Sequence, residues 1–213
     1  MLIRYHGHSM FELESAEGYR IVTDPFDATV GYPMKELKAD AVTVSHGHFD
    51  HAHTASCPGA RVLDAEGEWF VAPNVRLRTV SSFHDDAQGS KRGRNLIFLY
   101  ELDGLTLCHL GDLGHELDEK TLKAIGPVDL LMLPIGGTYT VDSPTAYQIA
   151  QAIRPRVILP MHYKTRVNAD WAITGPEAFR ALAGEGLGPC PLLRVTKEVI
   201  ECCPPIVWMD WEA

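Results

Sequence analysis

Short apolar runs separated by polar turns dominate the first half of the chain. Segment 2–14 alternates apolar and polar positions, whereas segment 41–46 is a continuous apolar run that ends at a histidine. Alternation is typical of a strand with one buried face, and a continuous run is typical of a strand buried on both faces. The same reasoning predicts strands within 19–25, 75–86, 95–112, 128–137 and 156–162. The pair Asp103-Gly104 between two apolar runs predicts a tight hairpin.

Three segments combine helical spacing with helix boundaries. In 143–153, Ser143 is the predicted N-cap and Pro144 the first helical residue. Segment 175–186 also has a proline, Pro176, ahead of its helical pattern and stops at glycine, and 116–126 is the third candidate. Strands interleaved with helices predict an α/β layered fold. With no repeat and no clear linker, the 213 residues predict a single domain over 1–213.

Composition narrows the classes of partner. The net charge of −9 is opposite to that of a protein that grips a phosphate backbone, so no nucleic acid is expected as a partner. No apolar run approaches the length of about 18 residues that spans a bilayer, and the N-terminus has no apolar leader, which predicts a cytoplasmic protein without a membrane partner. The five cysteines have neither zinc-binding nor disulfide-framework spacing, which argues against redox or cysteine-nucleophile chemistry.

Histidines cluster after one predicted strand. The stretch "SHGHFDH" supplies His46, His48, Asp50 and His51 within six positions, from a chain with ten histidines. Alternate residues of an extended loop point to one side, so the first two imidazoles can reach one metal ion. Imidazole and carboxylate ligands suit zinc, iron, manganese or nickel, and the lack of thiolates argues against a closed structural zinc site.

Four residues cannot complete two metal shells, so further ligands must come from other strand ends. The candidates are His84, Asp112 and His162, each of which follows a predicted strand. Carboxyl ends of strands in an α/β sheet collect along one edge, where ligands bind. A lone histidine in a strand is more often a core residue, which is the interpretation for His109.

The ordered motifs resemble a known family. "HGHFDH", His84, "GD" at 111–112 and "PMH" at 160–162 are similar, in order, to the five-part motif of the metallo-β-lactamase-fold hydrolases. "YHGHSMF", "IVTDPF" and "LLMLPIGGTYTVD" resemble a branch of small bacterial and archaeal metal-dependent hydrolases related to the L-ascorbate-6-phosphate lactonase-like proteins. The resemblance implies a four-layer αββα sandwich with two divalent metal ions at one edge, zinc first, with manganese, iron and nickel as alternatives.

The resemblance also implies a role for each ligand. The first metal would take His46, His48 and His84, the second would take Asp50, His51 and His162, and Asp112 would bridge them. The implied function is a hydrolase that uses a metal-bridging hydroxide on a small ester, lactone or phosphoester, with Asp50 also steering the proton of the nucleophile. Two alternatives stay open: a nuclease or phosphodiesterase of the same fold, and a non-catalytic metal- or ligand-binding protein.

Several residues near these motifs have roles that the sequence leaves less defined. His8 is expected to contact a metal ligand or the substrate, and His6, two residues earlier on the same predicted strand face, to be structural. His115 is expected beside the substrate, with a plain surface position as the alternative, and His53 is expected to be exposed. The apolar C-terminal segment 206–212 would seal a core or a homo-oligomer interface.

The substrate clues are weaker. In the loop 136–143, Gly136 would allow a close backbone approach, and Tyr139 and Thr140 would contact a substrate. Local cations within an acidic protein favour a small-molecule, anionic substrate, although each one taken alone is better explained as solvated surface charge. These cations are Lys91, Arg92, Arg94, Lys164 and Arg166.

Overall fold

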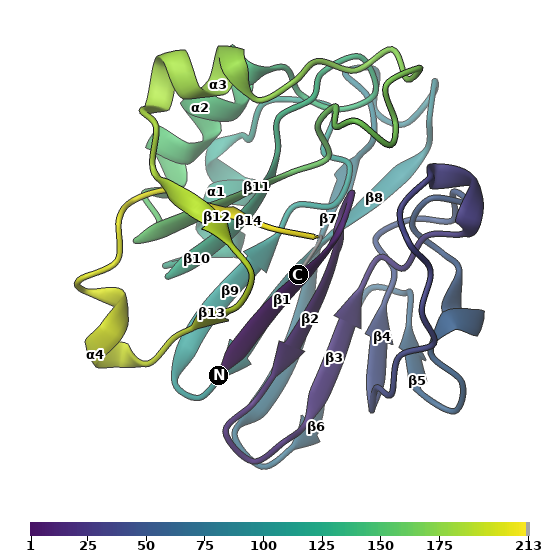
Figure 1. Cartoon of the computed structure of the whole chain (residues 1–213), viewed down its shortest axis with the longest axis vertical. Coiled ribbons are helices and arrows are strands. Elements are labelled where there is room, and N and C mark those ends of the chain that lie inside the picture. Colours follow the sequence, from purple (N-terminus) through teal and green to yellow (C-terminus); the bar gives the residue numbers. More distant parts are fainter. Residues whose placement is uncertain (212–213) are drawn as a thin grey trace.

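The computed structural model describes residues 1–211, which form two packed six-stranded sheets (Figure 1). In spatial order, the first sheet contains β13 (Leu193–Arg194), β1 (Leu2–Gly7), β2 (Met10–Glu14), β3 (Arg20–Thr23), β4 (Ala41–Thr43) and β5 (Arg61–Leu63). The second contains β11 (Val157–Met161), β10 (Leu130–Pro134), β9 (Leu105–His109), β8 (Arg94–Leu102), β7 (Val75–Phe83) and β6 (Glu68–Ala72). Both sheets are mixed, since β3–β4–β5 and β9–β10–β11 are parallel and the other pairs are antiparallel.

Side chains of successive residues in the central strands point to opposite faces of the sheet and so pack in two different hydrophobic cores. In β8, Phe98 and Tyr100 lie in the core between the sheets, whereas Ile97 and Leu99 pack against the helices on the other face. A strand that is buried on both faces needs apolar residues at every position. This is the physical reason for the continuous apolar run in the sequence.

The outer layers differ in composition. The helices α1 (Glu119–Ile125), α2 (Ser143–Ile153) and α3 (Glu177–Ala183) lie on the side of the second sheet that faces away from the first (Figure 1). The outer face of the first sheet is covered by loops and two 3-10 turns, η1 (Ala28–Val30) and η2 (Thr54–Ser56), over a small apolar core. The predicted sandwich is confirmed, with irregular segments in place of long helices over the first sheet.

The predicted turns and caps are mostly correct. Asp103 and Gly104 adopt φ values of 52° and 75°, the left-handed pair that a tight hairpin between β8 and β9 requires. One prediction was wrong by a residue: the N-cap of α2 is Asp142, whose carboxylate accepts the backbone N–H of Thr145. Ser143 is the first helical residue, and its hydroxyl donates to the Ile135 carbonyl.

The C-terminal part of the chain closes the second sheet. Here β12 (Leu187–Cys190) pairs with β14 (Val207–Met209), the short helix α4 (Lys197–Ile200) lies between them in sequence, and a bridge from Ile206 to Ile158 joins this pair to β11. Residues 206–209 are buried, so this part of the predicted apolar segment seals a core, while residue 212 lies outside the described residues. The longest helix of residues 1–211, α2 with 11 residues, falls well short of the length that spans a bilayer.

Candidate metal centre

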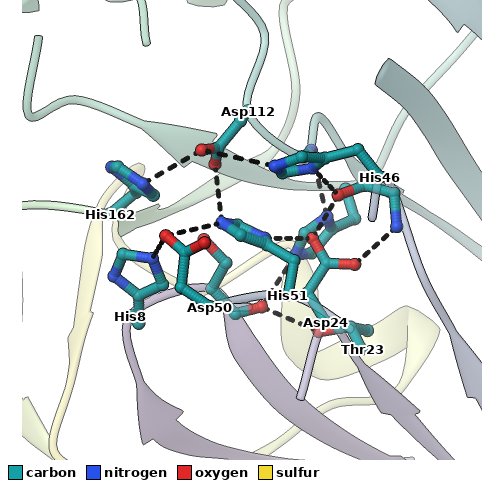
Figure 2. A network of polar contacts seen from close by, with 12 residues as sticks. His8, Thr23, Asp24, His46, Asp50, His51, Asp112 and His162 are labelled. Carbon is teal, nitrogen blue, oxygen red and sulfur yellow. Dashed lines mark hydrogen bonds and ion pairs between the residues drawn. The ribbon is translucent and has the colours of Figure 1, made fainter. Parts of the chain in front are cut away.

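Strand direction brings the predicted ligands to one edge of the sandwich. In the first sheet, β1 and β3 are both antiparallel to β2, so the carboxyl ends of β1, β3 and β4 coincide. In the second sheet the same holds for β7, β9, β10 and β11. His46, His84, Asp112 and His162 each follow one of these ends. The two sheets therefore deliver their polar side chains to a common site (Figure 2).

The ligand atoms form two groups, in each of which they lie within 4.8 Å of one another. The first group contains His46, His48 and His84, and the second contains Asp50, His51 and His162 together with His8. Asp112 lies between the groups: its Oδ2 is 3.3 Å from Nε2 of His84 and 3.1 Å from Nε2 of His162. The structure thus brings all seven predicted ligands together, in the two sets that the motifs imply, and adds His8.

Asp112 is held from behind by Asn95, a residue that the sequence analysis missed. The Asp112 backbone N–H donates to Oδ1 of Asn95 at 2.9 Å, and the Asn95 amide donates to the Leu110 carbonyl and the Ser82 hydroxyl. Gly111 makes this approach possible, because a Cβ there would lie 2.3 Å from the Asn95 oxygen and its φ is +56°. A buried polar residue at the start of an otherwise apolar strand was the available signal.

Asp24, which was not assigned a role from the sequence, fixes two imidazoles. Its Oδ2 accepts the Nδ1–H of His51 at 2.8 Å, which leaves Nε2 of His51 facing Asp112. The Ser45 hydroxyl donates to the same carboxylate and therefore accepts from Nδ1 of His46 at 2.9 Å. Both histidines therefore hold their Nδ1 proton away from the site, and Nε2 is the nitrogen available to a metal ion. Burial lowers the pKa of His51, but the carboxylates of Asp112 and Asp24 outweigh it and raise that pKa well above its usual range, so a metal ion would displace the proton from Nε2. The aspartate in "IVTDPF", directly after a strand, was the signal.

His8 enters the site because the chain turns after β1. Gly7 and His8 have φ values of +102° and +54°, so His8 leaves the strand face occupied by His6, and the prediction that both share one face was wrong. Nε2 of His8 lies 3.1 Å from Oδ2 of Asp50, and since that carboxylate only accepts, Nε2 is the donor. His6 instead pairs with Glu12. Gly7 accommodates the Tyr32 ring rather than another backbone.

His8 and His162 also link the two sheets through their backbones. The His162 N–H donates to the His8 carbonyl at 2.8 Å, and the φ of His162 is +51°. Left-handed conformations at residues other than glycine are strained and concentrate at functional sites. Gly136 packs on this turn, because a Cβ there would lie 2.2 Å from the His162 carbonyl oxygen. The close approach predicted for Gly136 is therefore to this turn and not to a substrate.

Burial and charge set the protonation of the site. Burial raises the pKa of Asp112, but the neighbouring His162 and His51 outweigh it and hold that pKa well below its usual range. Burial also raises the pKa of Asp50, and the hydrogen bond from His8 and the charge of His51 lower it further than burial raises it. Burial and the nearby His162 lower the pKa of His8 to about 4. At neutral pH the two carboxylates are ionised and His8 is neutral.

Six buried side-chain atoms of the centre lack a hydrogen-bond partner within residues 1–211. They are Nε2 of His46 and His51, Nδ1 of His8, His84 and His162, and Oδ1 of Asp112. A buried polar atom without a partner is costly, and the great majority are satisfied in native proteins. Imidazole nitrogens and carboxylate oxygens at this spacing are the donor set that binds divalent transition metals. The residues present therefore fit the pair of cations that the motifs imply.

A cleft of about 740 Å³ opens beside the two groups. It is lined by His48, Asp50, His84 and Asp112 from the centre, and by Gly47, Phe49, Arg92, Tyr139, Asp170, Trp171 and Ala172. Tyr139 and Arg92 were predicted to reach a substrate, whereas Thr140, Lys164 and Arg166 are not part of this lining. Phe49 and Trp171 were missed, although an aromatic residue between two ligands, as in "HFDH", was a usable signal.

The remaining histidines lie around the centre. His109 is buried, donates from Nε2 to the Ser9 carbonyl and accepts the Gly111 N–H at Nδ1, which makes it a satisfied core residue. His115 is absent from the cleft lining: its Nε2 accepts the Phe83 N–H and its Nδ1 donates to the Glu116 carbonyl. It supports the end of β7. The expected position beside the substrate is therefore not found, since His115 does not line the cleft. His53 is half-buried rather than exposed.

Comparison with known proteins places this centre in a family. A model described as the beta-lactamase superfamily domain matches residues 2–162. The chain belongs to the beta-lactamase superfamily. A UPF0173 metal-dependent hydrolase of Thermoplasma acidophilum is 30% identical over 208 residues, which cover 85% of this chain and 90% of that relative. The family resemblance and the prediction of a metal-dependent hydrolase are confirmed.

Solved structures of the beta-lactamase superfamily share the fold over nearly the whole chain. A metallo-β-lactamase superfamily protein of Thermotoga maritima is 35% identical, with a TM-score of 0.78, and the match covers 98% of this chain and 97% of that one. Igni18, a metallo hydrolase from Ignicoccus hospitalis, is 23% identical with a TM-score of 0.65 over 92% of this chain and 99% of its own. The second match shows the fold alone.

Proposed function

We propose that this beta-lactamase superfamily member is a hydrolase with a dinuclear centre that cleaves a small ester, lactone or phosphoester. The observation that carries the proposal is the position of Asp112 between two ligand groups beside an open cleft. His46, His48 and His84 would hold one divalent ion, Asp50, His51 and His162 the other, and Asp112 would be shared. Such ions, when bound, supply a water of lowered pKa and stabilise developing negative charge on oxygen.

The side chains of the cleft wall would perform the remaining steps. Asp50 accepts the proton of the attacking water, because its carboxylate is ionised at neutral pH and faces the cleft. His8 donates to Oδ2 of Asp50 and holds that carboxylate in orientation. The carboxylate of Asp24 holds the Nδ1 proton of His51 directly and that of His46 through Ser45, which leaves Nε2 of both rings for the metal ions. Aromatic walls at Phe49 and Trp171 exclude bulk water from one side of a bound substrate.

Metal analysis of variants tests the centre. We expect His48→Ala and Asp112→Ala each to lose bound metal and to abolish hydrolysis, with Asp112→Ala losing more because its carboxylate is shared by both sites. His53→Ala is the matched control, since His53 lies in the same loop and outside both ligand groups. Retention of full metal content by both ligand variants would show that the assignment is wrong.

A substrate screen tests the reaction class. We expect metal-loaded protein to hydrolyse at least one aryl ester, lactone, thioester or phosphodiester, and to lose this activity when a chelator removes the metal. Rapid cleavage of structured RNA in place of these substrates would support the nuclease alternative. Metal-loaded protein that is inert throughout the panel would support the non-catalytic binding alternative.

A further inference from the structure

Arg92 is the single lysine or arginine among the residues that line the cleft. We propose that the cleft selects a substrate with an apolar, ring-shaped body and an anionic group, and that Arg92 binds the anion. The inference rests on the proposed function, since it assigns the substrate class of the same site. The anionic group is a carboxylate or a phosphate, which share the oxygen geometry that a guanidinium recognises with two parallel hydrogen bonds.

The charge of Arg92 is available to a ligand. The neighbouring cations of its loop are neutralised, because Lys91 pairs with Asp86 at 2.6 Å and Arg94 pairs with Glu66 at 3.6 Å. Arg92 pairs with no carboxylate of residues 1–211. Two of the three cations of this loop thus lie beside surface carboxylates, and the third, Arg92, lines the cleft.

The backbone of Arg92 is fixed relative to the metal centre. Asp85 directly follows His84, is buried, and accepts the backbone N–H groups of Ala87, Gly89, Lys91 and Arg92 at 2.7–2.9 Å. A loop ordered in advance loses little entropy when a ligand binds, which favours a binding role over a solvated surface charge.

The side chain of Arg92 is oriented by an aromatic ring. Its Cζ lies 5.6 Å from the centroid of the Tyr139 ring, within the range of a cation–π contact. Stacking restrains the plane of the guanidinium while leaving its N–H groups free to donate along their edges. Lysine would keep the charge at this position but would lose both the stacking and the two-pronged donor geometry.

Three aromatic rings define the body of the substrate. The Trp171 ring lies 6.2 Å from that of Phe49 and 6.4 Å from that of Tyr139, all three in the cleft lining. Phe49 is 54% exposed and lines the cleft, so an apolar ligand bound there would cover its ring. Asp170, the carboxylate next to Trp171, disfavours a second anionic group on that side. Ring-shaped apolar molecules with one anionic group match this lining.

Binding of three matched probes to the metal-loaded protein tests the inference. The probes are 2-naphthoate, 2-naphthylphosphonate and neutral 2-naphthamide, measured by calorimetry. We expect at least one anion to bind more tightly than the amide, and Arg92→Gln to weaken that anion about ten- to hundredfold, the usual loss of a charge-assisted hydrogen-bonded pair. The two anions distinguish a carboxylate from a phosphate-type substrate.

Matched variants separate Arg92 from general charge and from the metals. Lys91→Gln removes the same charge from the same loop and should change the affinity less than about twofold, since Lys91 is already paired. Direct binding of the anion to metal contributes equally in every variant, so it cancels in the comparison. The anion affinity of Arg92→Lys should lie between those of the wild type and Arg92→Gln. The inference would be overturned if Arg92→Gln and Lys91→Gln weakened anion binding equally, or if the wild type bound the neutral amide as tightly as both anions.

Hydrolysis assays keep this inference distinct from the proposed function. Anion binding that depends on Arg92, without turnover of any ester, lactone or phosphoester, would refute the hydrolytic proposal and leave the binding site standing. Turnover of neutral and anionic aryl esters with the same KM, unchanged in Arg92→Gln, would refute the anion site and leave the hydrolase standing.

Discussion

Asp24 accepts the Nδ1–H of His51 at 2.8 Å while the Ser45 hydroxyl, bound to the same carboxylate, accepts from His46. One aspartate therefore sets the protonation of a histidine from each of the two proposed ligand groups. The φ of Asp24 is +40°, a strained conformation for a residue with a side chain. The hydrogen bonds of the Asp24 carboxylate to Ser45 and His51 hold the residue in this conformation against its backbone preference.

Replacement of Asp24 should weaken metal binding. In Asp24→Asn one acceptor oxygen becomes an amide donor, so the tautomers of His46 and His51 are no longer enforced. We expect metal affinity to fall about ten- to a hundredfold, the usual effect of losing a partner behind a ligating histidine. Titration against a competing chelator measures this, with the exposed Asp64→Asn as the control. Equal affinities of the two variants would contradict the role assigned to Asp24.

Replacement of His8 should impair turnover and spare the metal. His8→Asn keeps a residue type that tolerates the φ of +54° and removes the imidazole that holds Asp50. We expect kcat to fall about ten- to a hundredfold with KM and metal content unchanged, because only the orientation of the proton acceptor is lost. His6→Asn, which alters a histidine outside the site, should leave kcat as it is. Loss of metal in His8→Asn would make His8 a ligand instead.

Acid should remove a stabilising contact near β1. The hydrogen bond from His6 lowers the pKa of Glu12, burial opposes it, and Arg4 lowers it further. A carboxyl whose pKa is lower in the folded than in the unfolded protein stabilises the fold at pH values above the unfolded pKa of about 4.3. This contribution disappears as the pH falls through the folded pKa. Glu12→Gln should therefore lower the free energy of unfolding by about 1 kcal/mol at pH 6.

Urea unfolding at two pH values measures this effect. The difference between wild type and Glu12→Gln should be smaller at pH 3.5 than at pH 6, because protonation of the wild-type carboxyl increases as the pH falls toward its lowered folded pKa. Glu17→Gln, at an exposed position in the next turn, is the control and should match the wild type at both pH values. A difference that stays constant between pH 6 and pH 3.5 would show that the carboxylate charge is not what stabilises this region.

Patterns of local origin were predictable from the sequence. The hairpin at Asp103-Gly104 depends only on the backbone freedom of two residues, and the ligands in "HGHFDH" follow one strand within six positions. The short strands β6 and β12 were not predicted, because their largely exposed or half-exposed positions carry little periodic signal, and the buried strand β14 was not predicted because its three residues are too few to show a period. The N-cap of α2 shifted from Ser143 to Asp142 because adjacent residues can both cap, and the geometry of the preceding loop decided between them.

The sequence by itself determined the buried strands through their periodicity, and the family through the order of the motifs. The resemblance to that family then implied the two-sheet sandwich and the proposed metal ligands at its strand ends. Only the tertiary structure decided which side chains support the site. Asp24, Asn95 and Trp171 act through partners at least 13 residues away along the chain, the separation of Asn95 and Ser82, and His8 enters through a left-handed turn. Such contacts arise when two sheets pack, and no local pattern along the chain records them.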